Sequence, residues 1–167
     1  MTTRRISITV PAAALLTLGA GVAVATMPFP AHAQHDHGHD AHATAELVLN
    51  DGARWSTDEP LRTGMQRIRE VAAPALTAEP GALSQKDAAA LATAIREQVA
   101  YLVANCHLEP KADAVLHVLI AELLGGAGEL ERDPASADGL PRIAHALQQY
   151  PEFFEHPGWK PVPALHQ

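Results

Sequence analysis

The sequence has a single cysteine, Cys106, and this scarcity limits the chemistry open to the chain. One thiol cannot form an internal disulfide, so Cys106 is a buried thiol, a metal ligand or half of an intermolecular bridge. Nucleophile motifs, phosphate-binding glycine loops and paired carboxylates beside a candidate base are also absent from the sequence. These absences predict that the protein is not an enzyme.

Long apolar runs are limited to the N-terminus, where residues 1–33 have the order of a secretory signal peptide. An arginine pair at positions 4 and 5 precedes an apolar run, and Ala31 and Ala33 form a small-x-small cleavage site. This order predicts cleavage before Gln34 and a periplasmic or secreted protein, with an uncleaved membrane anchor as the alternative. No later segment approaches the roughly twenty apolar residues that a membrane span needs.

Positive charge is scarce as well. The chain has 12 lysine and arginine residues against 19 acidic residues, which gives a net charge of −7 with histidine neutral. Cleavage of the signal peptide removes two arginines and no acidic residue, so the mature charge is about −9. This charge argues against nucleic acids and anionic membranes as partners.

Histidine, in contrast, is concentrated in one short segment. Residues 34–45 read QHDHGHDAHATA and have no apolar period, which is typical of a disordered arm. Neutral imidazoles suit Cu(II), Ni(II) and Zn(II), so the arm is predicted to capture metal ions. Its candidate ligands are His35, His37, His39 and His42. The alternative is a solvated linker with incidental histidines.

The rest of the chain contains four amphipathic segments and no alternating pattern of the kind that predicts strands. After the lead-in that ends at residue 57, the predicted helices are residues 58–78, 85–106, 110–125 and 139–150. They predict an all-α fold, an antiparallel up-down-up-down four-helix bundle over residues 58–150. Residues 151–167 contain four prolines and are predicted to form an irregular tail.

Local signals set the expected helix ends. Asp58 or one of the two residues before it is a predicted N-cap, and Ser84 with Asp87 resembles a capping box. Pro110 fits the first turn of the third helix. Three glycines are predicted to end that helix: Gly125, Gly126 and Gly128.

Three side chains with affinity for soft metals are expected in one half of this bundle. Met65 and His117 both lie about 10 Å from the same bundle end, given a rise of about 1.5 Å per residue. Cys106 is expected a turn or two nearer the mouth, and His107 at the rim. A thioether, a thiolate and an imidazole together suit copper(I). Each also has a structural interpretation, as core methionine, boundary histidine and inert thiol.

Asp113 belongs to the same hypothesis, because it precedes His117 by four residues and therefore lies on the same helix face. Its carboxylate is predicted to orient the imidazole, which is the usual arrangement around a metal-ligating histidine.

The segment Leu61-Arg62-Thr63-Gly64-Met65 resembles, in its placement, the methionine-bearing first helix of the soluble b-type cytochromes, exported bundles similar to the cytochrome c-prime family. The resemblance implies a haem held by a first-helix methionine and a fourth-helix histidine. The sequence departs from these families at two points. Val103 stands where the first cysteine of Cys-x-x-Cys-His would be, which argues against covalent haem, and His145 falls off the apolar stripe of the fourth helix.

The leading hypothesis is an exported bundle that binds a transition metal, copper, for storage, delivery or tolerance. Its inner ligands are Met65, Cys106 and His117, and the histidine arm is an outer capture segment. One alternative is a structural or adaptor bundle that binds a periplasmic protein or a second copy of itself. The other is a bundle that binds haem without covalent attachment.

Overall fold

The computed structural model describes residues 46–79 and 81–163, and these residues form four α-helices. The helices are α1 (Glu59–Leu76), α2 (Gln85–Asn105), α3 (Pro110–Arg132) and α4 (Gly139–Phe153). No strand occurs among the described residues, so the prediction of an all-α bundle is confirmed for this part of the chain. The predicted signal peptide, the histidine arm and the last four residues of the tail lie outside the described residues.

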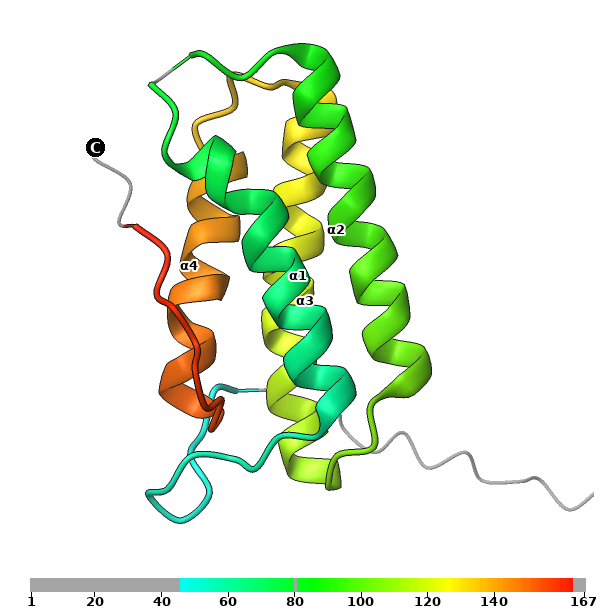
Figure 1. Cartoon of the computed structure of the whole chain (residues 1–167), viewed down its shortest axis with the longest axis vertical. Helices are drawn as coiled ribbons and strands as arrows, with labels where there is room; N and C mark the ends of the chain where they lie inside the picture. Colours follow the sequence, from blue (N-terminus) through cyan, green and yellow to red (C-terminus); the bar gives the residue numbers. More distant parts are fainter. Residues whose placement is uncertain (1–45, 80, 164–167) are drawn as a thin grey trace, which may run out of the picture. The chain divides into compact units, whose positions relative to one another are not determined.

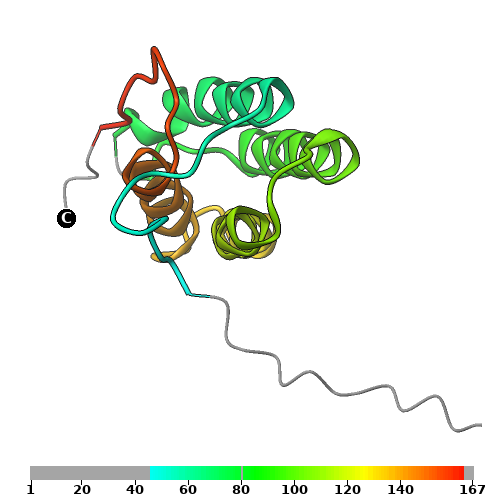
Figure 2. The same cartoon turned by 90° about the horizontal axis from the view of Figure 1, so that it is seen from below.

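Neighbours in sequence are neighbours in space. The helices pack in the order α1, α2, α3, α4 around the bundle, and the colours in Figure 1 show that successive helices run in opposite directions. The end-on view in Figure 2 shows the same order, with α4 returning beside α1. The contact between α1 and α4 is the least extensive of the four, so this seam is the most open side of the bundle.

Side chains at the helix starts explain where α1 and α2 begin. The Asp58 carboxylate accepts a hydrogen bond from the backbone N–H of Leu61 (2.8 Å), which satisfies one of the free donors in the first turn of α1. The Ser84 hydroxyl accepts from the N–H of Asp87 (3.1 Å) and donates to the Asp87 carboxylate (2.6 Å). Both caps act within one turn, which is why local sequence signals were enough to predict them.

The end of α3 differs from the prediction. Gly125, Gly126 and Gly128 do not end this helix, which continues to Arg132, about two further turns. Gly125 and Gly126 lie where α3 and α4 approach each other, whereas Gly128 faces Arg96 of α2. A Cβ built at Gly126 would lie 2.7 Å from the carbonyl oxygen of Gly139 and 2.7 Å from Cγ1 of Ile143. The small residue therefore allows close packing of two helices instead of a change of backbone direction.

This difference predicts opposite effects for two neighbouring substitutions. Gly126→Ala should lower the free energy of unfolding by about 1–3 kcal/mol, because its methyl group meets the α4 backbone. Gly128→Ala should raise it by up to about 1 kcal/mol, because alanine favours the helix and the nearest atom, Nη2 of Arg96, is 3.9 Å away. Urea titration of the two variants provides the measurement, and equal shifts would contradict the close-packing role of Gly126.

The end of the bundle that contains the start of α1 is closed by backbone pairing between distant segments. The N–H of Trp55 donates to the carbonyl of Phe153 (2.7 Å), and the N–H of Glu155 donates to the carbonyl of Trp55 (2.9 Å). The rings of Trp55 and Phe154 are both buried beside this pairing. The lead-in before α1 is therefore fixed to the end of α4.

Two ion pairs join neighbouring helices on the surface. Arg96 of α2 pairs with Glu131 of α3, and Arg142 of α4 pairs with Glu122 of α3 (Nε to Oε2, 3.0 Å). None of the four is buried, so each pair contributes little to stability. Among the helices that the structure describes, none is long and apolar enough to cross a membrane.

Candidate functional site

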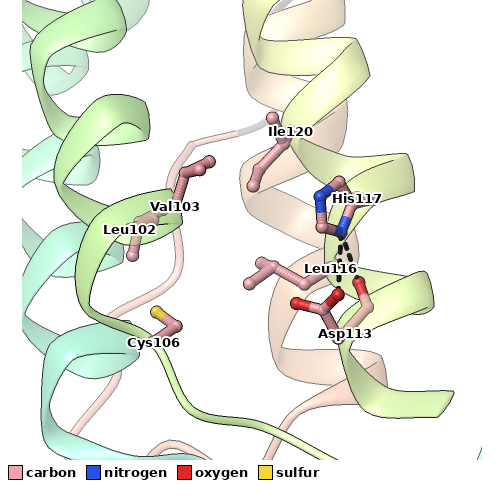
Figure 3. Close-up of a pocket in the computed structure, with 7 residues that line it drawn as sticks. All are labelled: Leu102, Val103, Cys106, Asp113, Leu116, His117 and Ile120. Atoms are coloured by element: carbon pink, nitrogen blue, oxygen red, sulfur yellow. Dashed lines mark hydrogen bonds and ion pairs between the residues drawn. The ribbon is translucent and has the colours of Figure 1, made fainter. Parts of the chain in front are cut away.

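A pocket of about 160 Å³ lies between the C-terminal end of α2 and the first half of α3 (Figure 3). Its walls combine apolar side chains with a thiol, a carboxylate and an imidazole. The lining residues are Leu102, Val103, Cys106, Asp113, Leu116, His117 and Ile120. The pocket therefore brings together three of the residues that the sequence singled out, Cys106, Asp113 and His117.

The imidazole of His117 is held by the turn that precedes it. Its Nδ1 lies 2.9 Å from the carbonyl oxygen of Asp113 and 3.4 Å from the Asp113 carboxylate. Both neighbours of Nδ1 are acceptors, so we assign the ring proton to Nδ1 and the free lone pair to Nε2. The side chain of His117 is 57% exposed, and Figure 3 places its second nitrogen on the side of Ile120. His117 is thus oriented but not buried, and Nε2 is available to a ligand.

Cys106 lies just beyond the last residue of α2, where its backbone N–H still donates to the carbonyl of Leu102 (2.9 Å). The thiol is half-buried and makes no disulfide. Burial, and then the negative charges of Asp58 and Asp113, raise the pKa of the Cys106 thiol to about 12. The thiol is therefore protonated at neutral pH, and a metal ion would have to displace its proton in order to bind.

Met65 does not join this pocket. The side chain is fully buried, at 0% exposure, among the apolar residues of the bundle core, and it is not one of the lining residues. The helical rise predicts the height of a residue along the bundle, but not the direction in which it points. Met65 points into the core, whereas His117 lies on the surface of α3. The structure therefore does not bring together the three inner ligands expected from the sequence.

Asp58 is a residue of this region whose second contact the sequence did not predict. Its carboxylate caps α1 through Oδ1 and accepts the backbone N–H of His107 through Oδ2 (2.7 Å). His107 itself is exposed, and its Nδ1 lies 2.8 Å from the carbonyl of Asn105. Asp58 therefore holds the residue after Cys106 in place and places a negative charge near the thiol. Only the capping half of this role has a local sequence signal.

The arrangement limits what the pocket can hold. Figure 3 shows the side chain of Leu116 projecting between Cys106 and His117. No group of three or more histidine, cysteine, aspartate or glutamate side chains among residues 46–79 and 81–163 is close enough to hold a metal ion. Small-molecule sites usually measure roughly 300–1,000 Å³. The volume fits an ion with one or two protein ligands much better than a macrocycle.

The two haem ligands implied by the resemblance lie in different environments, one in the core and one on the surface. Met65 is buried in the core, and His145 is on the exposed face of α4, as its helical angle predicts. Comparison of the chain with protein-family models, with curated proteins and with solved structures found no match in any of the three.

Proposed function

We propose that this protein is an exported helical bundle that binds copper(I) at the α2–α3 pocket, for storage, delivery or tolerance of the metal. The proposed ligands are the Cys106 thiolate and Nε2 of His117. The observation that carries the proposal is that both side chains line one pocket, with Asp113 orienting the imidazole. A thiolate with an imidazole is a soft ligand pair that suits copper(I).

The proposed site includes a movement. Leu116 lies between the two ligands, so its side chain must turn aside when both bind one ion. Val103, on the opposite wall, is 67% exposed, so that wall adjoins open solvent that can receive the displaced side chain. In this proposal the apolar lining then covers the bound ion and excludes competing water ligands.

The histidine arm has a separate role in this proposal. His35, His37, His39 and His42 precede the bundle and offer imidazoles, which bind Cu(II), Ni(II) and Zn(II) as well. Replacement of all four by alanine should lower Cu(II) uptake and leave Cu(I) binding at the pocket unchanged. A parallel loss of both would mean that the arm itself holds the copper(I).

Titration with copper(I) against a chromogenic chelator tests the pocket. The protein should bind about one equivalent per chain with Cys106 and His117 intact, and His117→Asn should weaken binding at least about tenfold. Cys106→Ser should weaken it further, because a hydroxyl is a hard and weakly acidic ligand. His145→Asn is the matched control, since this exposed histidine lies on α4 and away from the pocket.

Met65→Leu separates the two possible ligand sets. If the pocket pair binds the metal, Met65→Leu leaves the affinity unchanged, because leucine fills the same core volume. If the affinity falls, Met65 is also a ligand, as the sequence predicts. Uptake of less than one equivalent of copper(I) by the unsubstituted protein would refute the proposal.

A structural or adaptor bundle is the second candidate, and one observation favours it. The pocket joins the buried side chains of Leu102 and Leu116 to the exposed side chain of Val103, which resembles a small apolar docking groove. In that case a copper(I) chelator should leave the thermal unfolding temperature unchanged, and Val103→Asp should weaken capture of the partner in a periplasmic pull-down. Haem binding remains an expectation of the resemblance alone, and the absence of a Soret band after haem titration would refute it.

A further inference from the structure

The segment after α4 packs back onto the bundle. Residues 155–163 run back along α4, as Figure 1 shows, and the end-on view in Figure 2 places them on the same side of α4 as α1. Val162 is buried, the ring of Trp159 packs edge-on against Tyr150 (4.8 Å between centroids), and Nε2 of Gln148 donates to the carbonyl of Pro163 (3.3 Å). The segment therefore packs on α4, and Thr57, just before α1, donates from its hydroxyl to the carbonyl of Glu155 (2.6 Å). The segment lies beside the α1–α4 contact, the least extensive of the four helix contacts.

One polar contact fixes this segment to the core. The phenol oxygen of Tyr150 lies 2.9 Å from Nδ1 of His156. Tyr150 is fully buried, and His156 is the hydrogen-bond partner that the described residues offer to its hydroxyl. We therefore assign the phenol as donor and Nδ1 as acceptor, which requires a neutral imidazole with its proton on Nε2.

Protonation of His156 is incompatible with this contact. A proton on Nδ1 turns the acceptor into a donor, so the phenol must rotate and leave its own hydrogen without a partner in an apolar cluster. The new charge also faces Arg62 of α1, a cation that already acts on this imidazole. Burial is the main cause that raises the pKa of the Tyr150 phenol. The charge of Arg62 opposes this rise, and Cys106 and Asp58, at the end of α2 and the beginning of α1, add to it.

Two further features of residues 155–163 favour their release from the bundle. The indole Nε1 of Trp159 is buried without a hydrogen-bond partner among the described residues, so detachment would allow it to bond to water. Gly158 adopts φ +80°, a conformation that favours glycine, and forms a turn between His156 and Trp159. Release therefore loses apolar contacts but gains hydration for one indole and, in acid, for one imidazolium.

We infer that residues 155–163 form a pH-responsive latch: protonation of His156 breaks its bond to Tyr150 and releases the segment from α4. The latch is a regulatory device, and it acts on a different side of the bundle from the α2–α3 pocket. Acid release would uncover the buried ring of Tyr150 without unfolding the four helices.

The sign of the pH dependence follows from the same contacts. Burial, and then the charge of Arg62, lower the pKa of His156 from its usual 6.5 in the folded protein. The unfolded or released segment therefore binds a proton more readily than the docked segment. The docked state is favoured fully above pH 6.5, and its advantage is lost as the pH falls from 6.5 toward the lowered value.

Hydrogen exchange of the purified protein, followed by mass spectrometry and corrected for intrinsic rates, tests the latch. Protection of backbone amides in residues 155–163 should fall about fivefold between pH 7.5 and pH 5, the change expected when one buried hydrogen bond is lost. Protection within α2 and α3 should stay constant. His156→Asn keeps an acceptor near the Nδ1 position but does not titrate, so its protection should not depend on pH.

Two further variants complete the test. His145→Asn removes an exposed histidine from α4 and should preserve the pH dependence of the unsubstituted protein. Tyr150→Phe removes the phenol and should reduce that dependence. If this variant fails to fold, His156→Asn alone decides the question. Constant protection from pH 7.5 to pH 5, or an equal fall in His156→Asn, would overturn the latch.

Discussion

We expect Cys106 in the folded protein to react with iodoacetamide at pH 8 about thirtyfold more slowly than in the chain unfolded by urea. Only the thiolate reacts, and the pKa of the folded thiol is raised to about 12, first by burial and then by Asp58 and Asp113. The reactive fraction falls by about three orders of magnitude, and the greater nucleophilicity of a high-pKa thiolate recovers about half of this on a logarithmic scale.

The electrostatic part of this effect has its own matched variants. Asp58→Asn removes the carboxylate charge and the acceptor for the N–H of His107 but retains a good N-cap for α1, so it should lower the pKa of Cys106 and speed alkylation. Asp51→Asn changes a charge in the exposed turn before α1 and should leave the rate unchanged. Equal rates for the folded and unfolded protein, or equal responses of the two variants, would contradict the assigned causes.

The same shift has consequences for stability and for metal binding. The neutral thiol stabilises the fold below pH 9.0, its usual pKa, and this contribution is lost as the pH rises from 9.0 toward 12. Copper(I) must displace a proton from Cys106, so its apparent affinity should rise with pH. A pocket cysteine with this pKa is poorly suited to redox catalysis, which requires a thiolate.

Phe154→Ala should destabilise the protein by about 3–5 kcal/mol, because the substitution leaves a cavity in the core. Phe154 is fully buried and stacks on Tyr150, with ring centroids 5.5 Å apart. It also follows Phe153, whose carbonyl accepts the hydrogen bond from Trp55 that closes this end of the bundle. For a domain of about this size, the loss corresponds to a fall of about 15 °C or more in the unfolding temperature.

Its neighbour provides the control. Phe153 is only half-buried, so Phe153→Ala removes less contact area and should destabilise the protein less than half as much. Urea and thermal unfolding of both variants, followed by circular dichroism, measure the difference. Similar losses would show that the helix end, and not the buried ring of Phe154, carries the stability of this region.

The sequence predicted the features of the fold that depend on neighbouring residues. Asp58, Ser84 and Pro110 mark helix starts through contacts within one turn, and the structure places those starts within a residue of the predicted positions. The end of α3 was missed because the role of Gly126 depends on the backbone of α4 at Gly139, a contact that no local pattern encodes.

The site was harder to predict for the same reason. Spacing placed Asp113 beside His117, since four residues along a helix bring side chains together. It also gave similar heights along the bundle axis for Met65 and His117. In the structure, however, the Met65 thioether is buried in the core and the His117 imidazole is exposed on the surface. The pairing of Tyr150 with His156 had a partial signal, a dense group of aromatic residues after α4. The chain reversal that completes it involves the turn at Gly158.

The pairing of Trp55 with the end of α4 also has a mechanical consequence. The two paired segments run parallel, so tension between the chain before Trp55 and the chain after Glu155 acts along them in shear. Both hydrogen bonds then carry this load together, because shear stretches them at the same time. The bundle therefore has a force clamp at the point where its chain enters and leaves.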